Sequence, residues 1–126
     1  MTGKRVLSVG QCSMDHGSIS HLLHSQFSAR VLPVATGEEA LGQLRRETYA
    51  LVLVNRVFDA TGESGLDFIR TVKGDADLEE VPMMLVSNYA ETQEEAQAAG
   101  AAPGFGKAQL HERQTIENLR PFLGES

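Results

Sequence analysis

Short apolar runs alternate with amphipathic stretches along the whole chain. Two of the runs, Leu51–Val54 and Met83–Val86, are apolar at every position, which is typical of central parallel strands covered by helices on both faces. A third run contains Pro33, which has no amide donor and therefore predicts an edge strand. The expected strands are Val6–Val9, Arg30–Val34, Leu51–Val54, Met83–Val86 and Pro103–Gly106.

The stretches between these runs carry apolar residues at helical spacing. Ile19, Leu22, Leu23 and Phe27 form one stripe, and Thr36 is the expected N-cap of the next helix. The expected helices cover 19–27, Glu38–Glu47, Gly65–Lys73, Glu91–Ala99 and Leu110–Leu123. Because crossovers between parallel strands are right-handed, this alternation predicts an α/β fold whose functional site lies at the carboxyl ends of the strands.

Composition narrows the class of protein. The 126 residues suit one domain spanning 1–126, with an ordered core at about residues 4–123. With 17 acidic and 11 basic residues the formal charge is -6, which disfavours nucleic-acid binding because that depends on clustered basic side chains. A single cysteine cannot form an internal disulfide, and no apolar stretch approaches the ~20 residues of a membrane span. We therefore expect a cytoplasmic protein that is not bound to a membrane.

Four segments occur in the order and at the spacing of a known family. They are Ala35–Leu41, Tyr49–Val54, Val81–Ser87, and Ala99–Ala101 followed by Lys107. Together they resemble the receiver domain of bacterial response regulators over essentially the whole chain. The resemblance implies a CheY-like, flavodoxin-like (βα)5 three-layer sandwich with the strand order 2-1-3-4-5 of the chemotaxis receiver. It also implies a place in two-component signal transduction, the phosphorelay pathway in which receivers act.

The positions that carry phosphoryl chemistry in that family hold other residues here. Asn55 stands where the family has its phospho-acceptor aspartate, and an amide has no anionic oxygen to attack phosphorus. Gly10 and Gln11 stand where two adjacent acids hold Mg²⁺. Because Mg²⁺ prefers carboxylate oxygens in near-octahedral geometry, we expect no Mg²⁺ site and no other cofactor. The resemblance therefore implies a degenerate pseudo-receiver.

Two polar residues match the family's phosphate-binding pair. They are Ser87 and Lys107, which together with Gly10 and Gln11 outline a degenerate pocket around Asn55. In this pattern Lys107 has no acid nearby, so it is expected to be an uncompensated positive charge that donates to the Asn55 side-chain oxygen.

The positions that transmit the signal in the family also differ. Two positions form the family's switch, and they correspond to Ser87 and Gly104 here. Gly104 replaces the aromatic residue whose rotation reports phosphorylation. The loop from Asn55 to Gly65 is about two residues longer than usual, with a turn at 59–62. These departures imply that the usual switch is lost.

The sequence thus predicts a phosphorylation-independent regulatory module that binds another protein. We expect no enzyme activity, because no acid, base and nucleophile converge on the strand ends. The expected partner is a histidine kinase or an output protein, bound at the last two helices and the fifth strand, which is the face that receivers commonly use. The expected state is a monomer or a weak homodimer.

Other functions stay open at this point. A small anionic ligand could occupy the pocket near Asn55, Ser87 and Lys107, or an authentic phospho-receiver could use a relocated acceptor, Asp59 or Asp15.

Two further hypotheses concern residues outside that pocket. Cys12 is a redox thiol if Lys107 lowers its pKa. His16, His21 and His24 cluster in the sequence but lack the cysteine or carboxylate that a zinc site usually adds.

Overall fold

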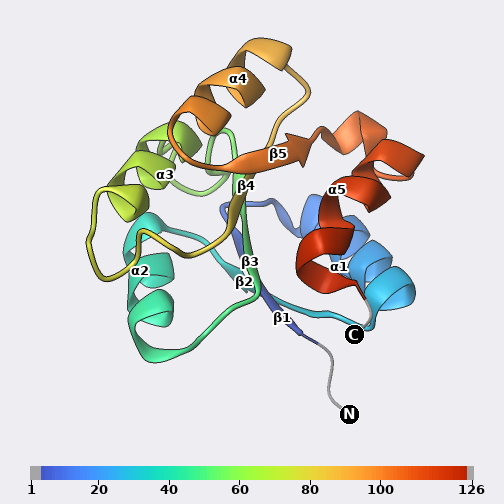
Figure 1. Ribbon diagram of the computed structural model, residues 1–126, viewed down its shortest axis with the longest axis horizontal. Helices are drawn as coiled ribbons and strands as arrows, with labels where there is room; N and C mark the ends of the chain where they lie inside the picture. The colour runs from blue at the N-terminus through green and yellow to red at the C-terminus, as the bar shows by residue number, and fades with distance from the viewer. Residues whose placement is uncertain (1–3, 125–126) are drawn as a thin grey trace.

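A central sheet lies between two layers of helices (Figure 1), and the computed structural model describes residues 4–124. Five parallel strands pair in the order β2-β1-β3-β4-β5. They are β1 (Arg5–Val9), β2 (Arg30–Val34), β3 (Leu51–Asn55), β4 (Met83–Val86) and β5 (Ala102–Phe105). The predicted flavodoxin-like α/β fold with strand order 2-1-3-4-5 is confirmed.

The helices divide between the two faces of the sheet. Helices α2 (Gly37–Arg46), α3 (Gly65–Lys73) and α4 (Ala90–Ala98) cover one face, and α1 (Ser13–Phe27) and α5 (Arg113–Leu123) cover the other (Figure 1). Along β3, Val52 and Val54 belong to the first apolar core, whereas Leu51 and Leu53 belong to the second. A strand that enters two cores is apolar at every position, as the sequence predicted. No helix within residues 4–124 is long and apolar enough to span a bilayer.

The edge position of β2 is also confirmed. This strand pairs only with β1, and no residue of it is fully buried. Its proline lies at that free edge, opposite Ser8 of β1. A residue without an amide donor is tolerated there because no second neighbour needs the hydrogen bond.

Helix ends follow the capping chemistry that the sequence predicts. The Glu39 amide donates to the Thr36 hydroxyl at 3.1 Å, and the Thr36 amide donates to the Glu39 carboxylate at 3.3 Å. This reciprocal pair is a capping box, and it starts α2 at Gly37. Gly100 follows α4 with φ of +113°, the left-handed conformation expected of a glycine after a helix.

The last helix is shorter than predicted. It begins at Arg113 and not at Leu110, and a 3-10 turn at Lys107–Gln109 precedes it. Leu110 is buried in the core shared with α1 and α5, so its apolar character reflects a packed turn and not a helical stripe. The Thr115 hydroxyl donates to the Gln109 carbonyl at 2.7 Å, a contact across the turn that no regular helix makes.

Candidate functional site

The carboxyl ends of β3, β4 and β5 surround a small polar cavity. Its volume is about 270 Å³, and its walls include Asn55, Ser87 and Lys107, three of the residues that the sequence assigned to one pocket. Gly10 and Gln11 are not among the residues that line it. The structure therefore brings together only part of the predicted set.

Asn55 lines this cavity, and its amide nitrogen is bound to backbone carbonyls. The side chain is 7% exposed, and Nδ2 donates to the Gly10 carbonyl at 2.9 Å and to the Val57 carbonyl at 2.7 Å. Both partners are acceptors, so this position requires a group that donates two hydrogen bonds. An ionised carboxylate only accepts, and here it would face two carbonyl oxygens.

Gly10 leaves no room for a side chain. Its φ is +77°, and a Cβ built on it would lie 2.4 Å from the ring of Phe58. Phe58 is 1% exposed and packs in the core beneath β1 and β3. An aromatic ring from the loop between β3 and α3 therefore fills the space that the side chain of the family's first acid would occupy.

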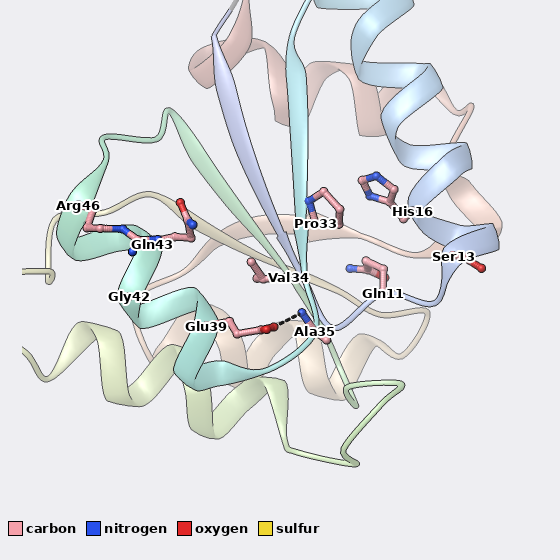
Figure 2. A pocket seen from close by; sticks show the side chains of 10 residues that line it. All are labelled: Gln11, Ser13, His16, Pro33, Val34, Ala35, Glu39, Gly42, Gln43 and Arg46. Carbon is pink, nitrogen blue, oxygen red and sulfur yellow. Dashed lines mark hydrogen bonds between the residues drawn. The ribbon is translucent and has the colours of Figure 1, made fainter.

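Gln11 points into a different cavity. This larger cavity, of about 730 Å³, lies between the start of α1, β2 and α2 (Figure 2). The Gln11 amide nitrogen and oxygen and the His16 Nδ1 are buried there without a hydrogen-bond partner. The site at Asn55 thus receives nothing from the position of the family's second acid.

The donor set at Asn55 does not fit a magnesium ion. Among the described residues Asp59 is the one carboxylate on the cavity wall, and Asn55 offers only a neutral amide whose nitrogen is bound to backbone carbonyls. Within residues 4–124, no three His, Cys, Asp or Glu side chains are placed to share an ion. Mg²⁺ in proteins needs one or two carboxylates with several waters in an octahedral shell, an arrangement that these residues do not offer.

Lys107 has an acidic partner, so its expected uncompensated charge is wrong. Its Nζ lies 2.7 Å from Asp15 Oδ2, and both side chains are about one-third exposed, at 35% and 29%. The hydrogen bond from Lys107 holds the pKa of Asp15 below its ordinary value. The sequence missed this pair because Asp15 lies in the first turn of α1, which folds over the ends of β1 and β5.

Cys12 positions that acid. Its Sγ accepts the Asp15 amide at 3.5 Å, which makes Cys12 the N-cap of α1. The thiol is half-buried, and the predicted redox role stays a prediction.

The Asp15–Lys107 pair predicts a pH-dependent contribution to stability. A carboxyl whose folded pKa is lowered stabilises the fold above its unfolded pKa and loses that effect as pH falls through the folded pKa. The Asp15→Asn variant should therefore lose about 0.5–1 kcal/mol at pH 7, a modest cost because the pair is partly exposed, and almost nothing near pH 2. Urea denaturation at both pH values measures the difference, with Asp59→Asn as the control. Equal losses at the two pH values would contradict this account.

The two switch positions are fixed by contacts of their own. The Ser87 hydroxyl lies 2.6 Å from the Thr92 hydroxyl and accepts the Tyr89 amide at 3.1 Å, so it stabilises the start of α4. A Cβ built on Gly104 would lie 2.2 Å from the Leu85 carbonyl oxygen. An aromatic residue therefore has no room at position 104 unless β4 and β5 separate.

Gln93 holds this arrangement in place, and no sequence pattern had indicated this role. Its Nε2 donates to the carbonyls of Leu85 and Ser87 at 2.9 and 3.1 Å, and its Oε1 accepts the Gly104 amide at 3.2 Å. One side chain of α4 thus bridges the backbones of β4 and β5. Because all of these contacts are to backbone atoms, they fix α4 against the sheet.

An exposed aromatic patch lies at the mouth of the cavity. The Arg56 guanidinium stacks 4.9 Å from the centre of the Tyr89 ring. Tyr89 is 56% exposed and Val57 is 43% exposed, which makes them two of the few large apolar side chains left open on the described surface. Tyr and Arg are among the residues enriched at the binding hot spots of protein interfaces.

Solved structures of response regulators have the same fold as this chain. A response regulator from Thermotoga maritima aligns with a TM-score of 0.76 at 20% identity, covering 99% of this chain and 100% of that one. The chemotaxis response regulator CheY4 of Vibrio cholerae aligns at 0.74 and 20% identity, covering 97% and 100%. A sensor protein from Polaromonas aligns at 0.81 and 20% identity, covering 95% of each chain.

These similarities are structural. No family model and no curated protein matches the sequence. The chain thus has the CheY-like receiver fold.

Proposed function

We propose that this chain is a phosphorylation-independent pseudo-receiver, a protein-binding module in two-component-type signalling in the cytoplasm. The observation that carries the proposal is the Asn55 amide, which donates to the Gly10 and Val57 carbonyls at the position of the family's acceptor. A side chain fixed as a double donor neither attacks phosphorus nor ligates a cation through its nitrogen.

The packing at Gly10 supports the absence of Mg²⁺ and of enzyme activity. Phosphoryl transfer needs a metal or another cation to neutralise the developing charge. The ring of Phe58 occupies the space of one family ligand, Gln11 turns to another cavity, and Lys107 is engaged with Asp15. We infer that the chain has no catalytic residues and needs no cofactor.

The rigid contacts of α4 support static recognition. Gln93 bridges β4 and β5, and Ser87 is bound to Thr92, so neither switch position is free to change. The stacked Arg56–Tyr89 pair then offers a preformed surface beside α4. A preformed surface loses less conformational entropy on binding than a mobile one. The partner that this proposal implies is a histidine kinase or an output protein.

Two other functions have one observation each. A small anionic ligand could enter the cavity with Lys107, but about 270 Å³ is below the usual ~300–1,000 Å³ of ligand pockets, and Asp15 already neutralises that lysine. A relocated acceptor is represented by Asp59, which lines the same cavity. Protein binding fits the observed contacts better than either of these alternatives.

Intact-protein mass spectrometry after incubation with Mg²⁺ and acetyl phosphate tests the proposal. We expect the protein to stay unmodified while an active receiver treated in parallel gains a phosphoryl group. A modified protein would overturn the proposal, and loss of the modification in the Asp59→Asn variant would identify Asp59 as the acceptor.

A further inference from the structure

A groove between α2 and α3 has an apolar floor. Its volume is about 520 Å³, and Leu41, Phe58 and Phe68 lie beneath it. The two rings meet edge to face with centroids 6.0 Å apart, and both belong to the core cluster of that face of the sheet. The floor is therefore rigid, and the groove has room for a large apolar side chain.

The rim of the groove is acidic. Glu38, Glu63 and Asp67 line it and are exposed, and no lysine or arginine of the described residues does so. Glu63 is held in place because its carboxylate accepts the Gly37 amide at 2.9 Å. Asp67 pairs with Arg70 one turn further along α3, at 3.3 Å and on an exposed surface where ion pairs are weak. The groove therefore presents net negative charge around an apolar centre.

One wall of the groove is the loop that the sequence singled out as longer than usual. The Phe58 amide donates to the Glu63 carbonyl at 2.9 Å, and the Gly62 amide donates to the Phe58 carbonyl at 2.8 Å. Gly62 adopts a φ of +77°, which permits this tight turn. The turn fixes both an acid of the rim and an aromatic ring of the floor, so the extended loop builds the groove.

We propose that this groove docks a partner segment in which a large apolar side chain is flanked by lysine or arginine. The inference rests on the proposed protein-binding function and gives it a second surface, distinct from the Arg56–Tyr89 patch. The argument is charge complementarity: an acidic rim attracts basic side chains, and the apolar floor buries the residue between them. The rim would repel an acidic segment, and a purely polar one would leave the apolar floor uncovered.

The docking is tested by titrating the ¹⁵N-labelled full chain with an unlabelled hexapeptide in which pairs of lysine and pairs of leucine alternate. We expect backbone amide shifts confined to α2, α3 and the 58–64 loop, with saturable binding below ~1 mM. The same peptide with serine in place of leucine should produce no saturable shifts. Absence of saturable binding, or shifts centred on Tyr89, would overturn the inference.

A matched pair of variants separates groove charge from overall charge. The Glu38→Gln/Asp67→Asn variant should weaken peptide binding about fivefold, because each exposed ion pair contributes little. The Glu94→Gln/Glu117→Gln variant removes the same charge from exposed positions of α4 and α5 and should bind like the unmodified chain. Equal weakening in both variants would reduce the effect to non-specific attraction and reject the groove.

Binding of a protein partner tests the proposed function separately from the groove. Candidate kinases and output proteins are tested for binding to the unmodified chain, the Glu38→Gln/Asp67→Asn variant and Tyr89→Ala. If only Tyr89→Ala weakens the binding of a confirmed partner, the protein-binding function holds and the groove inference fails. Weakening by the groove variant supports the inference. A groove-dependent dimer in sedimentation would instead assign the groove to a second copy of this chain and overturn the inference.

Discussion

The Gly10→Asp variant is expected to lose roughly 3–5 kcal/mol of folding free energy, because an L residue is strained in left-handed backbone and the added atoms overpack the core. The φ of +77° and the 2.4 Å approach to the Phe58 ring are the causes. A domain of ordinary stability has only ~5–15 kcal/mol in total, so the loss is severe. Urea denaturation followed by circular dichroism measures it.

Gly42→Ala is the matched control for that variant. Gly42 lies within α2, and beyond the adjacent backbone of that helix no described atom lies within 4 Å of a Cβ built on it. Alanine there should raise stability by roughly 0.5–1 kcal/mol, because glycine is unfavourable inside a helix. If Gly10→Asp proved as stable as the original chain, the account of Phe58 as the residue that fills the acid site would be wrong.

The Asn55→Asp variant is expected to lose roughly 3–5 kcal/mol at pH 7, because it leaves an unpaired buried charge beside two carbonyl oxygens. These surroundings raise the pKa of the introduced carboxyl in the folded state. A raised folded pKa means that stability is greatest below the unfolded pKa and is lost as pH rises through the folded pKa. The deficit relative to asparagine should therefore shrink towards pH 4. Urea titrations at pH 4, 5.5 and 7 follow it.

Asn88→Asp provides the comparison for the same chemical change. The Asn88 side-chain oxygen accepts the Ala108 amide at 3.1 Å, so a carboxylate keeps this bond and should cost little. The Asn55→Asp variant should also stay unmodified by acetyl phosphate, since Gly10 and Gln11 still supply no acid. If the Asn55→Asp variant were fully stable at pH 7 and became phosphorylated, Asn55 alone would be what prevents phosphorylation of this chain.

The sequence predicted the features of the fold that depend on local pattern. The apolar runs of β3 and β4, the edge proline of β2 and the N-cap at Thr36 were all predictable, because periodicity and capping act over a few residues. The start of α5 was not readable, because the burial of Leu110 depends on helices far away in the sequence.

The candidate site was less predictable for the same reason. Asn55, Ser87 and Lys107 line one cavity, as expected when strand ends meet at one edge of a parallel sheet. The contact of Phe58 with Gly10 and the pairing of Lys107 with Asp15 join distant segments, and no short pattern announces them. The direction of the Gln11 side chain likewise depends on the β1–α1 turn and not on residue type.

The free edge of β2 limits how copies of this chain can associate. The Arg30 amide donates to the Lys4 carbonyl, and the Val34 carbonyl accepts from the Gly10 amide. The backbone amides and carbonyls of the even-numbered residues of β2 therefore point to β1, and those of the odd-numbered residues point outward. Of the outward positions, Pro33 has no donor, and the Ala35 amide already donates to Glu39 at 2.9 Å. A second sheet therefore finds few amide donors along this edge, which disfavours strand-by-strand growth into fibrils at high protein concentration.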